Sequence, residues 1–156
     1  MIQASVLIVD DEPSVRQTLS EWMRKKNFHV FEAEGGRQAM EMIQREDPDI
    51  VISDVVMPGM DGIQLLKEAK AVKADIPFLM ISGYPSCSTA VDIMTYGASD
   101  YLPKPFTPDE LVHRVSRTLR LKALSKPLVP ARGIILGAVI SATMWMLIIG
   151  AILAHF

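Results

Sequence analysis

Five polar residues that could carry chemistry each follow a short apolar run of the sequence: Asp10, Asp11, Asp54, Ser82 and Lys104. If those runs are parallel strands, their carboxyl ends open onto one crevice, where open α/β sheets place their ligands. Three carboxylates held together repel one another unless a cation lies among them, and Mg²⁺ prefers oxygen ligands. Together with a hydroxyl and an ammonium, such a site favours metal-assisted phosphoryl chemistry.

The elements that must position these residues alternate between strands and helices. Three of the expected strands are unbroken apolar runs, as is typical of parallel strands covered on both faces. The helices are amphipathic instead. We expect strands near residues 5–9, 29–32, 49–53, 77–81 and 99–102, and helices near residues 13–26, 36–46, 62–73, 87–96 and 108–122. The pattern predicts an α/β fold.

Four motifs in this order resemble the receiver domain of bacterial two-component response regulators. They are Val6–Pro13 with its acidic pair, Asp54–Gly62, Ser82–Gly83 and Tyr101–Phe106. The resemblance implies a flavodoxin-like, doubly wound sheet of five parallel strands in the order 2-1-3-4-5. The receiver domain would occupy residues 1–122.

By this resemblance, Asp54 is the phosphoacceptor. It would take a phosphoryl group from a histidine kinase or a phosphotransfer protein, as an aspartyl phosphate. Mg²⁺ would be held by Asp54, by Asp11 directly, by Asp10 largely through water, and by the backbone carbonyl of Val56. The metal would clamp the phosphoryl oxygens and offset the charge that develops during transfer. We expect no enzyme activity beyond self-phosphorylation and dephosphorylation on Asp54.

The resemblance also implies a conformational switch. Lys104 would pair with the phosphoryl group, the hydroxyl of Ser82 would hydrogen-bond it, and Tyr101 would turn inward behind Ser82. Each residue also has a plain structural interpretation, because turn aspartates, loop lysines and half-buried strand tyrosines are common. Their occurrence as a set favours the functional interpretation. A cis peptide between Lys104 and Pro105 is implied as well.

The net charge of −2 hides an asymmetry along the chain. Residues 1–113 carry 18 acidic and 10 basic side chains, whereas residues 114–132 carry six basic side chains and no acidic one. A basic tract can bind nucleic acid, but no helix-turn-helix or other reading module follows it, so we expect no nucleic-acid partner. The single Cys87 excludes an intrachain disulfide.

An uncharged segment of 22 residues, 133–154, follows the basic tract. Ten of its residues are Leu, Ile or Val, and together they contribute roughly −3 to −6 kcal/mol towards membrane insertion. As a helix it would be roughly 33 Å long, against about 30 Å for the hydrocarbon core of a bilayer. We expect a single-pass C-terminal transmembrane helix over residues 133–154, joined to the receiver by a basic, proline-containing linker at residues 123–132.

The flanking charges predict the orientation of this helix. Six Lys or Arg residues precede it and none follows it, so the positive-inside rule places the receiver in the cytoplasm, anchored to the cell inner membrane. Gly133, Gly137 and Ser141 recur every four residues along the span. Two alternatives stay open: a homodimer through close backbone approach, or a monomeric anchor with incidental small residues.

The leading hypothesis is a membrane-anchored response regulator of a phosphorelay, with no DNA-binding or enzymatic output. It would signal by protein–protein interaction, for example with a membrane-protein output partner. One alternative is a phosphorylation-independent membrane interaction platform. A metal-dependent phosphohydrolase is disfavoured, because Val56 lies two positions past Asp54, where a general acid would be needed.

Overall fold

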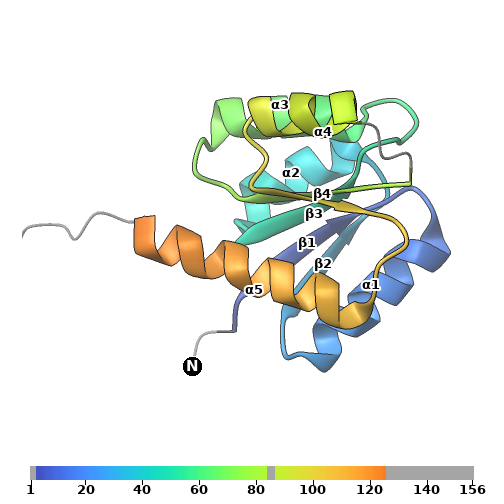
Figure 1. Ribbon diagram of the computed structural model, residues 1–156, viewed down its shortest axis with the longest axis vertical. Coiled ribbons are helices and arrows are strands. Elements are labelled where there is room, and N and C mark those ends of the chain that lie inside the picture. Colours follow the sequence, from blue (N-terminus) through green and yellow to red (C-terminus); the bar gives the residue numbers. More distant parts are fainter. Residues whose placement is uncertain (1–2, 84–86, 126–156) are drawn as a thin grey trace, which may run out of the picture. The chain divides into compact units, whose positions relative to one another are not determined.

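A computed structural model describes residues 3–83 and 87–125 of the chain. Strands and helices alternate through this part, and Figure 1 shows their arrangement. The strands are β1 Ser5–Val9, β2 His29–Ala33, β3 Ile50–Asp54, β4 Phe78–Ser82 and β5 Asp100–Pro103. The helices are α1 Pro13–Lys25, α2 Gly36–Glu46, α3 Gly62–Val72, α4 Cys87–Thr95 and α5 Pro108–Ser125. Each of the ten predicted elements is present, and the largest shift of an end is at α5.

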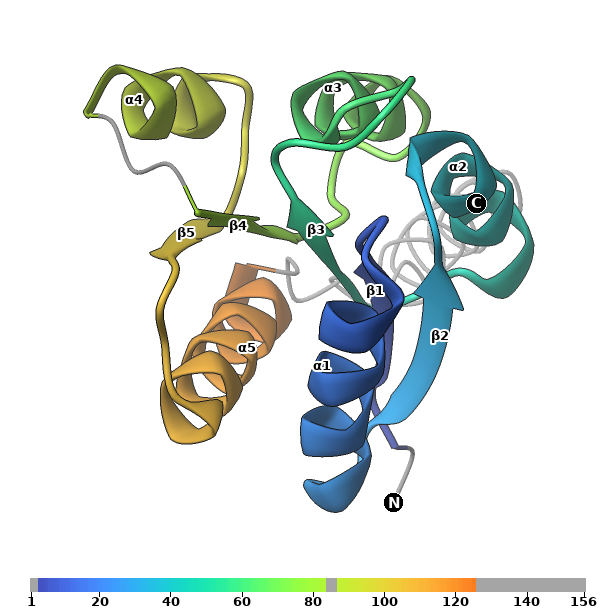
Figure 2. The ribbon, with the colours of Figure 1, turned by 90° about the vertical axis from the view of Figure 1, so that its right-hand side faces the viewer.

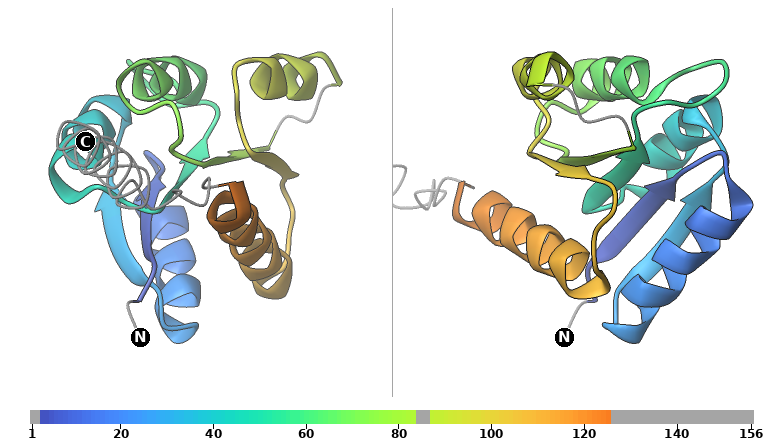
Figure 3. Two further views of the ribbon diagram at one scale, coloured as in Figure 1. Left: turned by 90° about the vertical axis from the view of Figure 1, so that its left-hand side faces the viewer. Right: turned by 45° about the vertical axis from the view of Figure 1, so that its right-hand side comes forward.

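The five strands form one parallel sheet in the order β2-β1-β3-β4-β5. This confirms the doubly wound, flavodoxin-like topology that the resemblance implies. Helices α1 and α5 cover one face of the sheet, and α2, α3 and α4 cover the other (Figures 2 and 3).

The core divides into two apolar layers, one on each face of the sheet. Because side chains alternate along a strand, Leu7 and Val9 of β1 pack towards α2 and α3, whereas Val6 and Ile8 pack towards α1 and α5. The central strands β1, β3 and β4 are buried along nearly their whole length. Their continuous apolar runs are explained by this double coverage.

The register of the sheet brings the strand ends to one edge. Val9 pairs with Ser53, Asp54 pairs with Ile81, and Ser82 pairs with Pro103. The residues that directly follow β1, β3, β4 and β5 therefore share this carboxyl edge. It is the edge at which the sequence predicts the functional residues.

Helix α5 begins as predicted and ends later than predicted. The hydroxyl of Thr107 accepts a hydrogen bond from the Glu110 amide at 3.2 Å, which caps the first turn. The Glu110 carboxylate lies 3.6 Å from Arg114. The helix continues to Ser125, three residues past the predicted end at residue 122.

The predicted transmembrane helix at residues 133–154 lies outside the described residues, as does most of the predicted linker. Within residues 3–83 and 87–125, no helix combines the length and the apolar character needed to cross a bilayer. The anchor and its orientation therefore stay predictions.

Candidate functional site

Three predicted site residues meet at the carboxyl edge of the sheet. The Nζ atom of Lys104 lies 2.6 Å from Oδ2 of Asp54 and 3.7 Å from Oδ2 of Asp10. These residues follow or end three different strands, β1, β3 and β5, so the fold alone brings them together. The ammonium thus lies between two carboxylates.

Asp10 is the most deeply buried acid of this group, with 3% of its surface exposed. Its Oδ1 accepts a hydrogen bond from the Glu12 amide at 2.9 Å. Burial raises the pKa of the Asp10 carboxyl, and although the Glu12 amide and Lys104 lower it, the net pKa lies above its ordinary value. The negative charges of Asp54 and Asp11 act in the same direction as burial. A further cation near Asp10 would relieve this unfavourable environment.

Asp54 is held by the backbone around it. Its Oδ1 accepts from the Val56 amide at 3.1 Å, while the Val55 amide donates to the Ile81 carbonyl at 2.9 Å. Gly62 packs so closely that a Cβ atom there would lie 2.0 Å from the Asp54 carbonyl oxygen. Only a glycine leaves room for the backbone of Asp54 at this point.

Lys104 reaches the site from the loop that follows β5. Its amide donates to the Ser82 carbonyl at 2.8 Å, and the predicted cis peptide between Lys104 and Pro105 is confirmed. Burial lowers the pKa of Lys104, but the hydrogen bond to Asp54 and the charges of Asp54 and Asp10 together raise it above its ordinary value. Lys104 is therefore a stable cation in the resting site.

These residues border a pocket of about 240 Å³ at the carboxyl edge. Asp11 and Val56, two of the predicted metal ligands, are exposed and line this pocket. The lining residues are Asp10, Asp11, Glu12, Asp54, Val56, Gly83 and Lys104. The pocket thus unites the predicted phosphoacceptor, acidic pair and lysine.

Of the two predicted switch residues, Ser82 directly precedes Gly83, which lines this pocket. Ser82, the last residue of β4, is 1% exposed. The ring of Tyr101 packs against the core layer under α2, α3 and α4. Its hydroxyl is buried and has no hydrogen-bond partner among the described residues. Tyr101 is thus already inward in this structure.

The donor set suits a hard divalent cation, although it is not arranged as a closed metal cage. Within the described residues, no group of three His, Cys, Asp or Glu side chains converges closely enough to hold a metal. Both Asp10 and Asp54 instead bind a backbone amide and Lys104. However, their oxygens share one pocket with exposed Asp11 and Val56, and carboxylate and carbonyl oxygens are the ligands that Mg²⁺ prefers.

Three contributors to the site were not predicted from the sequence. Arg16 of α1 donates to the Asp10 carbonyl at 2.7 Å, Glu12 supplies the amide that binds the Asp10 carboxylate, and Gly62 makes room for Asp54. Glu12 directly follows the acidic pair in the sequence, and this adjacency indicates that it belongs to the same site. The role of Arg16 depends on how α1 packs, which the sequence does not reveal.

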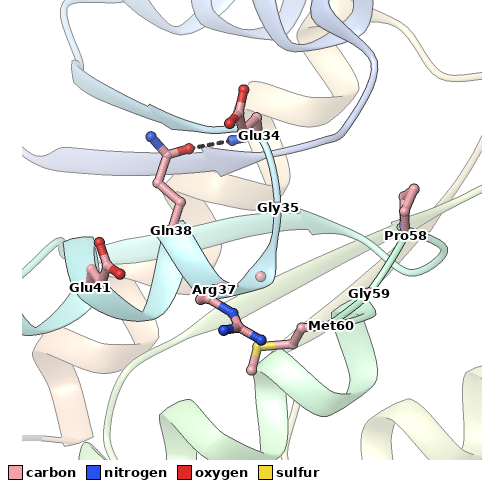
Figure 4. A pocket seen from close by; sticks show the side chains of 9 residues that line it. Glu34, Gly35, Arg37, Gln38, Glu41, Pro58, Gly59 and Met60 are labelled. Atoms are coloured by element: carbon pink, nitrogen blue, oxygen red, sulfur yellow. Dashed lines mark hydrogen bonds between the residues drawn. The ribbon is translucent and has the colours of Figure 1, made fainter.

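A second pocket, of about 370 Å³, lies between the start of α2 and the loop that follows β3 (Figure 4). Met60 of that loop packs against Gly36, where a Cβ atom would come within 2.6 Å of the Met60 side chain. Gly35, beside it, has open space at the corresponding position. The loop that follows the predicted phosphoacceptor is therefore supported by α2 as well as by α3.

Comparison with known proteins identifies a family. The model of the response regulator receiver domain matches residues 6–116. The chain is 40% identical over 121 residues to the regulatory protein AtoC of Escherichia coli, covering 78% of this chain and 26% of AtoC. It is 34% identical over 123 residues to sporulation initiation phosphotransferase F of Bacillus subtilis, covering 79% of this chain and 99% of that protein.

Solved structures give the same result. The chemotaxis protein CheY4 of Vibrio cholerae superposes with a TM-score of 0.72 at 33% identity, covering 75% of this chain and 99% of CheY4. NtrX of Brucella abortus superposes with a TM-score of 0.76 at 31% identity, covering 80% of this chain and 29% of NtrX. The chain thus spans nearly all of some relatives and about a quarter of others.

Proposed function

Because the chain belongs to the response regulator receiver domain family, we propose that it accepts a phosphoryl group on Asp54 and signals through protein–protein contacts. The phosphodonor is a histidine kinase or a phosphotransfer protein. The observation that carries this proposal is the position of Lys104, which pairs with Asp54 and lies 3.7 Å from Asp10 within one open pocket.

In the proposed reaction, a carboxylate oxygen of Asp54 attacks phosphorus and the bond to the donor nitrogen breaks. The Val56 amide, 3.1 Å from Oδ1 of Asp54, orients the carboxylate. Lys104 offers an ammonium to the incoming phosphoryl oxygens without changing its place on the sheet edge. Pre-positioned charge of this kind lowers the barrier because it needs little rearrangement.

The residues that would hold Mg²⁺ are Asp10, Asp11, Asp54 and the Val56 carbonyl. When bound, the metal supplies charge that offsets the negative phosphoryl oxygens during in-line transfer. Asp10 is suited to this role because its buried carboxylate lies near the negative charges of Asp54 and Asp11, which a bound cation would offset.

Ser82 and Tyr101 are the proposed switch. The hydroxyl of Ser82 hydrogen-bonds the phosphoryl group, and this movement changes the packing of Tyr101 behind it. Tyr101 is anchored by its amide, which donates to the Asp100 carboxylate at 2.8 Å. Its change of packing alters the surface of α4, β5 and α5, which contacts the output partner.

We further propose that residues 133–154 anchor the chain in the inner membrane, with the receiver in the cytoplasm. The absence of charge over these residues and the six preceding basic residues support it. The output partner would then be a membrane protein or a second copy of this chain.

The test is labelling with acetyl phosphate in the presence of Mg²⁺. We expect label on the wild-type chain and none on Asp54→Asn. Asp61→Asn is a matched control, because Asp61 is an exposed carboxylate that caps α3 through the Gln64 amide, and asparagine caps helices equally well.

Two outcomes would contradict the proposal. Label retained on Asp54→Asn would exclude Asp54 as phosphoacceptor, and full labelling in the presence of a chelator would exclude the metal. A chain that takes no label under any of these conditions would instead be a phosphorylation-independent interaction platform.

A further inference from the structure

The outward side of α5 carries two exposed leucines in its last two turns. Leu121 and Leu124 expose 55% and 76% of their surfaces. The opposite side of the same helix is buried, through Leu111, Val115 and Thr118. Because residues three or four apart lie on one side of a helix, the two leucines form a continuous apolar strip that the receiver core does not need.

Two arginines flank this strip. Arg117 and Arg120 are exposed on the same side of α5. Other cations of the helix are engaged: Arg114 pairs with Asp100 at 2.8 Å, and Lys122 donates to the Asp49 carbonyl at 3.4 Å. Arg117 and Arg120 have no ion pair or hydrogen bond to any residue that the structure describes. The two arginines without a partner among the described residues therefore lie on the same side of α5 as the exposed leucines.

We propose that this basic leucine face, defined as Arg117, Arg120, Leu121 and Leu124, lies on the surface of an anionic lipid bilayer. Leucines enter the boundary between headgroups and acyl chains, while arginines keep their charge at the anionic headgroups. The inference rests on the proposed membrane anchor and adds an orientation of the receiver to it.

The position of the face agrees with this orientation. Lys122 contacts Asp49, which directly precedes β3, so the last turns of α5 lie at the amino edge of the sheet. The pocket of Asp10, Asp54 and Lys104 lies at the opposite edge. A receiver that rests on the last turns of α5 keeps this pocket, at the opposite edge, open to a cytoplasmic kinase.

The length of chain beyond α5 also agrees. Helix α5 ends at Ser125 and the predicted span begins at residue 133. The intervening seven residues, 126–132, reach at most about 25 Å when fully extended. The last turns of α5 are consequently the part of the described helices that the anchor restrains most closely.

The experiment uses the full chain reconstituted into vesicles, with Cys87→Ser removing the native thiol. A polarity-sensitive fluorophore is attached to Leu124→Cys, and quenching by lipids that carry a nitroxide near the headgroup is measured. We expect strong quenching in phosphatidylcholine that contains phosphatidylglycerol and weak quenching in phosphatidylcholine alone.

A matched position and a matched charge change complete the design. Val72→Cys probes another exposed apolar residue, 61% exposed at the end of α3, which lies on the other face of the sheet. It should stay unquenched.

The charge-reversal variant Arg117→Glu with Arg120→Glu should lower the ratio of docked to undocked receiver at least about tenfold, because each cation near an anionic surface contributes about fivefold. Arg37→Glu with Arg45→Glu, which makes the same charge change on α2, should leave it unchanged.

The outcomes separate the anchor from the docked face. If the chain floats with carbonate-washed vesicles but Leu124→Cys is unquenched, or is quenched no more than Val72→Cys, the face does not dock and the anchor stands. If the chain is released by carbonate, the anchor itself fails. If the fluorophore is buried only at high protein density, a second copy covers the face and the proposal is overturned.

Discussion

Lys104 and Asp54 are paired across an intervening strand. The lysine follows β5 and the aspartate ends β3, yet Nζ and Oδ2 lie 2.6 Å apart over the end of β4. The lysine side chain passes Gly83, which follows β4, because a Cβ atom there would lie 3.9 Å from its Cδ atom. The same pair places the ammonium within 3.7 Å of Asp10.

Replacing this lysine should change both stability and metal binding. In Lys104→Ala, Asp10 and Asp54 lose their shared cation, so we expect a loss of about 1 kcal/mol, which allows for partial solvent screening of the pair. Mg²⁺ should then stabilise the variant more than the wild type, because no ammonium competes for the carboxylates. Urea denaturation with and without Mg²⁺ measures both effects. Lys25→Ala, an exposed lysine at the end of α1, is the control. Equal stabilisation of Lys104→Ala and wild type by Mg²⁺ would contradict the prediction.

The buried carboxyl of Asp10 should make stability depend on pH. Its pKa in the folded chain is raised, chiefly by burial. A raised pKa means that the group favours folding at pH values below its ordinary pKa of 3.8, and that this contribution is lost as the pH rises through the folded value.

We therefore expect Asp10→Asn to be more stable than the wild type at pH 7, by on the order of 1 kcal/mol. The advantage should shrink as the pH falls towards the ordinary pKa of an aspartate. Denaturant unfolding at several pH values without Mg²⁺ tests this, with the exposed Asp92→Asn as control. An Asp10→Asn variant that is less stable than wild type at pH 7 would refute it.

The packing of Gly36 against Met60 predicts a contrast between two adjacent glycines. A side chain at Gly36 would meet both the side chain and the carbonyl of Met60, so Gly36→Ser should cost about 1–3 kcal/mol through overpacking. It should also slow phosphorylation, since Met60 lies in the loop after Asp54. At Gly35 an added side chain would meet open space, and the backbone is extended with φ −179°. Serine is also favoured where a helix begins, so Gly35→Ser should be tolerated.

Thermal unfolding and acetyl phosphate labelling of the two serine variants measure this contrast. We expect Gly35→Ser to stay within about 0.5 kcal/mol of the wild type. Equal effects of the two substitutions on labelling would show that the contact with Met60 does not position the loop.

The hydroxyl of Tyr101 should lower stability in the resting state. It is buried, and the described residues offer it no hydrogen-bond partner, a situation that costs about 1–3 kcal/mol. Tyr101→Phe should accordingly raise the free energy of unfolding by about 1 kcal/mol. Tyr96→Phe should have little effect, because Tyr96 is 41% exposed. A destabilised Tyr101→Phe would mean that the hydroxyl has a partner in solution.

The sequence predicts the fold well because the central strands are buried on both faces. The apolar runs before Asp10, Asp54 and Ser82 leave little choice of element, and parallel pairing then places their ends at one edge. The end of α5 was predicted less well. Its last turn, up to Ser125, is exposed apart from Lys122, so no buried apolar residue marked its continuation.

Contacts between distant segments account for what the sequence does not reveal. The inward position of Tyr101 depends on the packing of the core under α4, and the hydrogen bond from Arg16 to Asp10 depends on how α1 lies on the sheet. The contact of Gly36 with Met60 joins the start of α2 to a loop residue 24 positions further along the chain. No local pattern of residue types predicts such contacts between residues that are distant in the sequence.

Because β5 lies at an edge of the sheet, local opening of that edge affects the site to which Lys104 belongs. β5 has only four residues and, among the described strands, pairs with β4 alone. Lys104 follows directly from it, whereas Asp10 and Asp54 follow or end interior strands. Edge segments open with less free energy than the whole domain. On warming, we therefore expect the proposed phosphoacceptor chemistry to be lost while most of the sheet is still folded, and hydrogen exchange at Tyr101 and Leu102 would mark the temperature at which that loss begins.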